Sequence, residues 1–213
     1  MEKHKQATTS MNRYLSTLLK FTSKDAHYPH LCGVHFNISN GIACATDGRS
    51  ALMLSATSDT IRSFCNELAT EKGLKTSQDE VTIIKLKKTW SINNNPYPNL
   101  FQIIPIGHYE EWNGFAFYNN IEFSKRIKSI ANLCGSYPDF STSQKSPYKA
   151  LQNYSTKKKG NETIHILTSI MPSNIEEHFE EENFEIKYSK VLGSNKPNME
   201  EVEYWKELQA KFK

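Results

Sequence analysis

Four residues that can bind a metal ion lie close together near the amino terminus: His27, His30, Cys32 and His35. Imidazole nitrogens and thiolates are common zinc ligands. If a strand starts at residue 30, His30 and Cys32 lie on one face and His35 on the other, because side chains alternate along a strand. His30 and Cys32 could then converge, with His27 reaching in from the preceding loop. Strand alternation thus counts against a complete set of ligands, so we predict no metal and no cofactor.

Other patterns that would indicate catalysis are missing from the sequence. Asp47 beside Arg49 could suggest acid chemistry, but an aspartate in a tight turn more often hydrogen-bonds its own backbone. The chain contains no nucleophile-elbow motif, no phosphate-binding loop and no HExxH zinc motif. Its four cysteines show no CxxC spacing and lie inside apolar runs, which favours reduced, buried thiols. We therefore predict a protein that is not an enzyme, and an enzyme on an unrelated fold is an alternative without a supporting motif.

The elements that would position these residues begin with a three-strand meander over residues 31–54. Asn40-Gly41 and Asp47-Gly48 tolerate positive φ, and each lies between runs of apolar and β-branched residues. Turns are expected at about 39–41 and 47–49. A helix over 58–69, with Ser58 as its N-cap, and a strand over 81–86 follow the meander.

Two further helices share one design, an apolar face opposite a basic stripe. The stripes comprise Arg13, Thr17, Lys20 and Lys24 on a helix at about 8–22, and Lys125, Lys128 and Asn132, flanked by Arg126, on a helix at about 121–134. A shared design suggests an internal repeat. Basic residues on an amphipathic helix are also typical of a solvated surface, so phosphate contact is one of two interpretations.

The second of these helices belongs to a further group of elements. Strands are expected over 115–118, 148–154, 163–170 and 184–188. The chain ends in a predicted helix over 198–212, with Val202, Trp205, Leu208 and Phe212 along one side. This helix either packs on its own domain or presents its aromatic residues to a partner.

Composition excludes some classes of protein. With 38% hydrophobic and 11% aromatic residues among 213, the chain can bury a core. No apolar run approaches the ~20 residues that span a bilayer, so we expect no membrane partner. The amino terminus lacks the apolar segment of a secretory signal, which predicts the cytoplasm of a bacterium or of a phage-infected cell. A net charge of +3 does not by itself indicate nucleic-acid binding.

Two segments carry a resemblance to a known family. One is Gly33 followed, after an apolar strand, by Ala45-Thr-Asp-Gly-Arg-Ser-Ala51; the other runs from Tyr97-Pro98 to Ile103-Ile-Pro105. In this order they resemble the bacterial β sliding clamp, the ring that holds a replicative polymerase on DNA. Its signatures are Ala-Thr-Asp-Gly-His-Arg-Leu-Ala and Phe-Pro-Asp-Tyr-Arg-Arg-Val-Leu-Pro.

The resemblance implies an α+β, DNA-clamp-like fold. Two βαβββ halves would place their helices on one face of antiparallel sheets, followed by the carboxyl-terminal helix. The expected parts are a first half at 1–56, an insertion or linker at 57–112, a second half at 113–192 and the final helix at 193–213. A clamp subunit of that family has three domains and is considerably longer than this chain.

The resemblance also implies a function, that of a small, non-catalytic, sliding-clamp-like protein associated with DNA replication. Expected partners are double-stranded DNA, a polymerase or another clamp-binding peptide, and further copies of the chain. The implied phosphate contacts are Arg13, Lys20, Lys24, Lys125, Arg126 and Lys128. The alternative is a clamp-derived interaction module that does not encircle DNA.

A peptide pocket is the second site that the resemblance implies. Its expected residues are Thr46, Gly48, Arg49, Pro98 and Ile103. Ser50, Ala51 and Gln102 replace a leucine and arginines of the family, which removes apolar bulk and charge. The two segments therefore either form a working pocket or are retained as scaffold.

Overall fold

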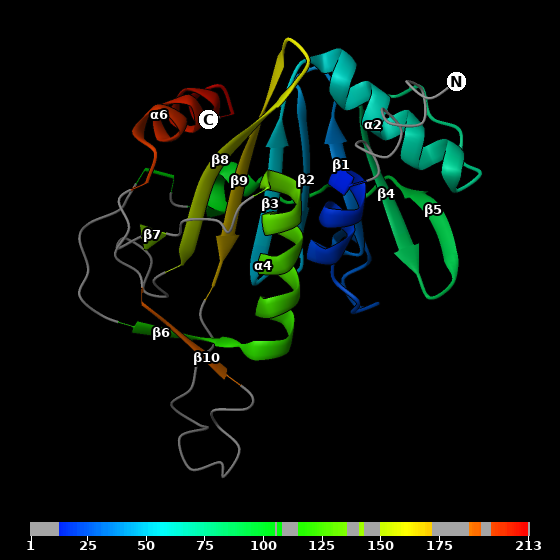
Figure 1. Cartoon of the computed structure of the whole chain (residues 1–213). Helices are drawn as coiled ribbons and strands as arrows, with labels where there is room; N and C mark the ends of the chain where they lie inside the picture. Colours follow the sequence, from blue (N-terminus) through cyan, green and yellow to red (C-terminus); the bar gives the residue numbers. More distant parts are fainter. Residues whose placement is uncertain are drawn as a thin grey trace. The chain divides into compact units, whose positions relative to one another are not determined.

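The computed structural model describes residues 13–104, 106–107, 115–135, 141–142, 150–171, 188–192 and 197–212. The chain divides into two compact units: unit 1 comprises Met1–Pro98 and Lys157–Ile166, and unit 2 comprises Asn99–Thr156 and Leu167–Lys213. Both contain helices and antiparallel strands, which confirms the α+β class (Figure 1). Whether residues 1–56 and 113–192 superpose as two halves stays a prediction.

Unit 1 is built on an antiparallel sheet. Its strands are β1 (Gly33–Asn37), β2 (Ile42–Thr46), β3 (Ser50–Ser55), β4 (Glu80–Leu86), β5 (Thr89–Asn93) and the first part of β9 (Glu162–Ile170), in the order β5-β4-β1-β2-β3-β9. Both expected turns are confirmed, since 38–41 and 47–49 connect β1, β2 and β3. The strand expected over 81–86 is also confirmed, whereas β5 was not predicted.

The two faces of this sheet differ in chemistry because cross-strand partners share a face. Phe36 is paired with Ala43 of β2 and with Val81 of β4, and all three are buried. His35 is paired with Cys44 and Thr82 on the opposite face. We call these the Phe36 face and the His35 face.

Two helices pack beside each other on the Phe36 face. One spans residues 13–18 and continues as η1 (Leu19–Phe21), and the other is α2 (Ser58–Glu71). The rings of Tyr14 and Phe64 stack with centroids 5.3 Å apart, which joins the two helices. Lys72, at the end of α2, lies over the Trp90 ring. Trp90 is on the Phe36 face because it pairs with Lys85, which lies four positions after Val81 on β4 and so shares its face. The apolar face predicted for α2 is confirmed by buried Ile61, Phe64, Cys65 and Leu68.

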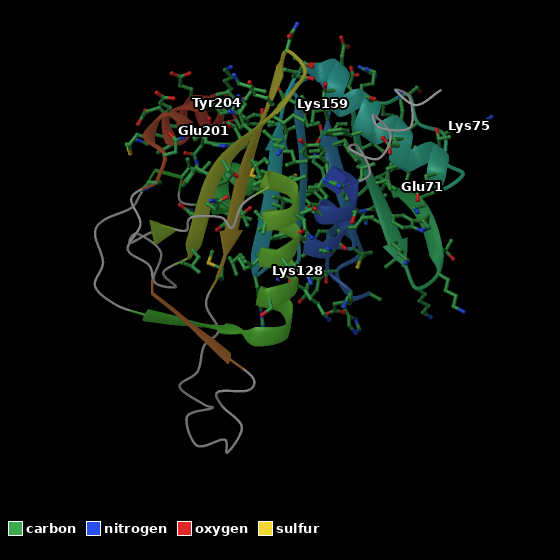
Figure 2. All side chains as sticks on the ribbon, viewed as in Figure 1. Glu71, Lys75, Lys128, Lys159, Glu201 and Tyr204 are labelled. Atoms are coloured by element: carbon green, nitrogen blue, oxygen red, sulfur yellow. The ribbon has the colours of Figure 1, made fainter. Side chains whose placement is uncertain are left out.

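The first turn of α2 corrects one prediction. Its N-cap is Thr57, not Ser58, and the Thr57 side chain accepts a hydrogen bond from the Thr60 backbone N–H. The Glu162 carboxylate of β9 accepts hydrogen bonds from the Thr57 backbone and from both threonine hydroxyls. Although burial alone would raise it, these bonds lower the pKa of Glu162. Lys159, labelled in Figure 2, places its ammonium group 5.4 Å from the Phe64 ring.

Unit 2 contains the second group of predicted elements. These are α3 (Leu100–Ile103), β6 (Phe115–Asn119), α4 (Asn120–Cys134), β7 (Ser141–Thr142), β8 (Leu151–Lys159, whose end lies in unit 1), the rest of β9, β10 (Tyr188–Leu192) and α6 (Met199–Ala210). Here β9, β8 and β7 lie in that order, and β6 pairs with β10. The predicted helices 121–134 and 198–212 are confirmed. Residues 184–187 of the last predicted strand lie outside the described residues.

The carboxyl-terminal helix packs within unit 2. Val202, Trp205 and Leu208 of α6 are buried, and Phe101 of α3 stacks on Phe212 with ring centroids 4.6 Å apart. Asn198 caps α6 by accepting a hydrogen bond from the Glu200 N–H. This confirms the apolar side expected for the helix. Among the described residues, no helix combines the length and apolarity needed to cross a membrane.

The cap of α2 gives the first testable prediction. Thr57→Ala removes the cap and one bond to Glu162, and should lower the free energy of unfolding by about 1–2 kcal/mol. Ser58→Ala is the matched control, because the Ser58 hydroxyl makes one long bond, 3.4 Å, to Ser39 O. Chemical denaturation monitored by circular dichroism measures both. Equal losses in the two variants would contradict the assignment of Thr57 as the cap.

Candidate functional site

The hairpin between β2 and β3 is held by its own side chains. Asp47 Oδ1 accepts hydrogen bonds from the backbone N–H groups of Arg49, at 3.0 Å, and Ser50, at 2.8 Å. Thr46 Oγ1 donates to Ser50 O at 2.8 Å and accepts from the Gly48 N–H at 3.0 Å. Gly48 has φ of +88°, which favours glycine. Asp47 therefore has the backbone-bonding role expected for a turn aspartate.

Tyr97, from the second of the two resembling segments, lies against the His35 face. Its ring stacks on the His35 imidazole with centroids 4.6 Å apart and planes 6° from parallel. Burial, together with the nearby Cys44, raises the pKa of the Tyr97 phenol well above its usual value. The phenol oxygen is buried without a hydrogen bond of normal geometry, although the Thr46 backbone lies near it. Tyr97, the first residue of the second segment, therefore meets the first segment within unit 1.

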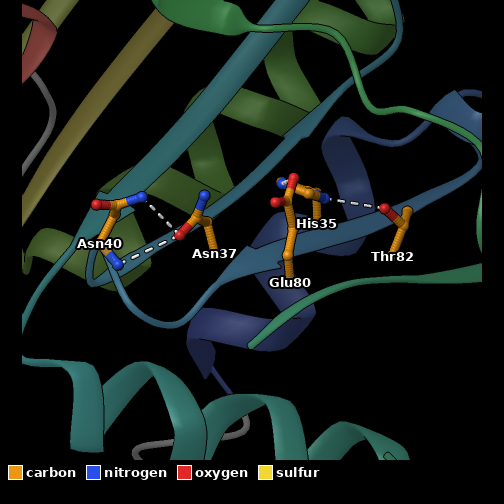
Figure 3. A network of polar contacts seen from close by, with 5 residues as sticks. All are labelled: His35, Asn37, Asn40, Glu80 and Thr82. Carbon is orange, nitrogen blue, oxygen red and sulfur yellow. Dashed lines mark hydrogen bonds and ion pairs between the residues drawn. The ribbon is translucent and has the colours of Figure 1, made fainter. Parts of the chain in front are cut away.

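His35 is a neutral, buried imidazole at neutral pH. Its Nδ1 is 2.9 Å from Thr82 Oγ1, and its Nε2 is 3.5 Å from a carboxylate oxygen of Glu80 (Figure 3). Burial lowers the pKa of His35 to about 4. The contact with Glu80, whose side chain is 67% exposed, is thus not an ion pair at neutral pH. Beside it, Asn37 Oδ1 accepts two hydrogen bonds from Asn40 and closes the β1–β2 turn.

The expected pocket residues divide between the two units. Thr46 is buried, Pro98 is half-buried, and Gly48 and Arg49 are exposed, all in unit 1. Ile103 belongs to α3 in unit 2, where its side chain is 57% exposed. Contact between Ile103 and the turn at Gly48 stays a prediction.

Segment 100–104 is anchored within unit 2 by the carboxyl-terminal helix. The Gln209 side-chain amide donates to Phe101 O at 2.5 Å, and the Asn99 amide donates to Phe212 O at 3.4 Å. Leu100, Phe101 and Ile104 are buried. Ile103 is therefore an exposed apolar side chain on a short helix whose other apolar residues are packed. Periodicity did not predict α3, which has four residues.

The basic residues expected at DNA differ in exposure. Arg13, Lys20 and Lys24 are exposed in unit 1, and Lys125 and Lys128 are exposed in unit 2 (Lys128 is labelled in Figure 2). Two residues depart from the predicted stripes. Thr17 is 4% exposed and its hydroxyl donates to Arg13 O, and Arg126 is 8% exposed. A buried guanidinium is poorly placed to reach a phosphate, so we remove Arg126 from the set of contacts.

The metal hypothesis changes in one detail. Residues 29–31 form the 3-10 helix η2 (Pro29–Leu31), so the alternation expected from residue 30 starts at Gly33. The Cys32 thiol donates to Asp25 O at 3.1 Å. Burial raises the pKa of Cys65 to about 11, and that of Cys44 still further, so both thiols are protonated at neutral pH. Within the described part of the chain, no three His, Cys, Asp or Glu side chains are grouped to hold a metal.

Comparison with known proteins gives matches to solved structures alone. No protein-family model and no curated protein matches the chain. The DNA polymerase sliding clamp of Bacillus subtilis is 14% identical with a TM-score of 0.29. The match covers 78% of this chain and 48% of the Bacillus subtilis protein. The DNA polymerase III beta chain of Streptococcus pneumoniae is 12% identical with a TM-score of 0.30 over the same shares. The DNA polymerase III beta subunit of Thermotoga maritima is 10% identical with a TM-score of 0.28, and the match covers 95% of this chain and 54% of that protein. The chain thus spans about half the length of these proteins.

The buried imidazole gives a prediction about acid stability. The folded pKa of His35, about 4, lies below the ordinary value of 6.5. As the pH falls, the unfolded chain therefore binds this proton before the folded protein does. The free energy of unfolding should fall by about 3 kcal/mol between pH 6.5 and pH 4. His35→Asn, which keeps an amide for Thr82, should remove this component of the pH dependence of the unfolding free energy.

The control for this measurement is Tyr97→Phe, which keeps the ring against His35 and removes the phenol hydroxyl. Its curve of unfolding free energy against pH should run parallel to that of the unmodified protein between pH 4 and 6.5. A curve for His35→Asn that also runs parallel would show that His35 is protonated normally in the folded state.

Proposed function

We propose that this protein is a small, non-catalytic, sliding-clamp-like protein that binds double-stranded DNA and assists replication as a processivity factor. The observation that supports this function is the contact of Tyr97, the first residue of the second resembling segment, with the first segment in unit 1, where its ring stacks on His35 near Thr46. In the sliding-clamp family the corresponding segments adjoin. Titratable groups in this region favour binding over catalysis, since His35 is neutral and Cys44 is a buried thiol.

Duplex binding would use the exposed basic residues. Arg13 and Lys20 lie on the first helical segment, Lys24 lies in the irregular segment that follows it, and all three are exposed. Lys125 and Lys128 are exposed on α4 in unit 2. Lysine and arginine contacts to phosphates position a protein on DNA without reading its sequence. Such contacts suit a protein that must move along the duplex.

Encirclement of DNA would require several copies of the chain. With one clamp domain per chain, a ring of the family's symmetry needs about six copies, and with two domains it needs about three. Light scattering in solution distinguishes these assemblies from a monomer, in which case the protein binds the duplex without enclosing it.

Salt dependence tests duplex binding. Affinity for a labelled duplex should be independent of sequence, and the log-log slope against salt should be roughly −0.9 for each phosphate contact. The double variant Lys20→Glu/Lys125→Glu should make the slope shallower by roughly 2. Lys158→Glu/Lys211→Glu is the matched control, because it also reverses one exposed lysine in each unit. Equal slopes for the test variant and the unmodified protein would contradict phosphate contact.

Exposure of Ile103 favours a second candidate function, capture of a peptide by a clamp-derived interaction module. Ile103→Asp should weaken binding of a fluorescent clamp-binding peptide by about tenfold or more, since apolar anchors dominate such interfaces. The control is Asn132→Asp, which introduces the same charge at an exposed position of α4 in the same unit. Both variants should keep the circular dichroism spectrum of the unmodified protein. If the unmodified protein does not bind the peptide, the two segments are scaffold, and Ser50, Ala51 and Gln102 are the replacements that explain it.

A further inference from the structure

The β4–β5 hairpin and the end of α2 bring together a basic cluster that the proposed function does not use. We name it the hairpin patch, and define it as Lys72, Lys85, Lys87, Lys88 and Trp90, all in unit 1. The ammonium nitrogens of Lys72 and Lys85 lie 5.0 and 5.6 Å from the centroid of the Trp90 ring. Lys85 and Trp90 are direct cross-strand partners. The register of the sheet therefore fixes this arrangement.

Positive charge prevails in the two segments that form the patch. Residues 71–75 and 85–90 contain five lysines and one acidic residue, Glu71. The Glu71 carboxylate pairs with Lys72 at 2.7 Å, and the Lys72 side chain is 22% exposed. Lys85, Lys87 and Lys88 are exposed. The hairpin tip thus presents several ammonium groups to solvent, and their mutual repulsion is a cost that an anionic ligand would offset.

Backbone geometry at the tip adds a second observation. Lys87 has φ of +54°, and it is the one residue other than glycine with positive φ in the described part of the chain. This conformation is disfavoured for a lysine and suits glycine or asparagine. A lysine in an ordinary conformation, such as Lys88, would be sufficient to protect the edge strand β5 against aggregation. The tip therefore carries a lysine at a position where glycine or asparagine would fit the backbone better, next to a second lysine.

We propose that the hairpin patch binds single-stranded nucleic acid through its phosphates. Lysines act as point charges that contact a phosphate backbone without sequence preference. Proteins that bind single strands combine such charges with aromatic rings on which bases stack, and Trp90 is a half-buried ring held among the lysines. An acidic peptide would only neutralise the lysines around the half-buried indole, whereas a nucleic acid would neutralise them and also offer a base to the ring. The observations therefore favour a nucleic acid over an acidic protein.

This proposal is independent of duplex binding because it uses different residues. The test measures fluorescence anisotropy of labelled oligo-dT and oligo-rU of about 15 nucleotides with the full chain, at several salt concentrations. The test variant is Lys87→Asn/Lys88→Gln. Its affinity at low salt should fall by about tenfold or more, and its log-log salt slope should be shallower by about 1.4, since single strands give about −0.7 per contact. Its midpoint of thermal unfolding should be unchanged or higher, because asparagine suits the conformation at position 87.

Two controls separate the patch from general charge and from folding. Lys158→Gln/Lys211→Gln removes the same charge elsewhere and should leave the affinity within about twofold. Lys88→Gln alone lies outside the strained position, and should still change the slope by about 0.7. Preference for oligo-dT or for oligo-rU distinguishes DNA from RNA as the source of the single strand.

Three results would overturn the proposal. The first is equal affinity and slope for the test variant and the unmodified protein. The second is an equal loss in the Lys158→Gln/Lys211→Gln control. The third is displacement of the oligonucleotide by a poly-glutamate peptide at equal charge concentration, which would indicate an acidic protein as the partner. Lys20→Glu/Lys125→Glu should retain single-strand binding, so failure of duplex binding and failure of this proposal are distinguishable.

Discussion

Alternation of side chains along β1 to β4 is the constraint on which unit 1 depends. Val34 and Phe36 lie on the face that the helices cover, whereas His35 lies on the face that Tyr97 covers. A shift of one residue in register would place His35 in the apolar layer beneath α2. The register is held by the turns at Gly41 and Gly48, where positive φ and the Asp47 bonds permit one hairpin geometry.

Burial of polar groups on the His35 face is a consequence of this constraint. His35 has a hydrogen-bond partner in Thr82, but it is neutral because the charged form would be buried. Tyr97 adds a phenol oxygen without a bond of normal geometry. A buried donor that lacks a partner costs about 1–3 kcal/mol. This face therefore carries polar groups whose burial is unfavourable unless hydrogen bonds offset it.

Local sequence signals predicted the parts of the fold that local physics determines. The turns at Gly41 and Gly48 and the apolar face of α2 depend on neighbouring residues, and all three are confirmed. The features that the sequence did not predict depend on contacts between residues far apart in the chain or on packing. Thr57 rather than Ser58 caps α2, with Glu162, a residue 105 positions away, bonded to the cap. β5 is short and partly polar, and it becomes a strand by pairing with β4. Arg126 lies at a predicted helix flank, yet its packing environment in unit 2 buries it.

Burial holds the histidine and two cysteines of unit 1 in protonation states that do not suit nucleophilic or acid–base chemistry. A nucleophilic cysteine needs a thiolate, and burial raises the pKa of Cys44 and of Cys65 away from that state. A general base works best with a pKa near the operating pH, and burial lowers the pKa of His35 to about 4. Exposed groups in the same unit carry both signs, among them Arg49 and the Glu80 carboxylate that lies 3.5 Å from His35. Burial has thus turned His35, Cys44 and Cys65 into neutral packing groups, while the charged side chains of this unit stay at its surface.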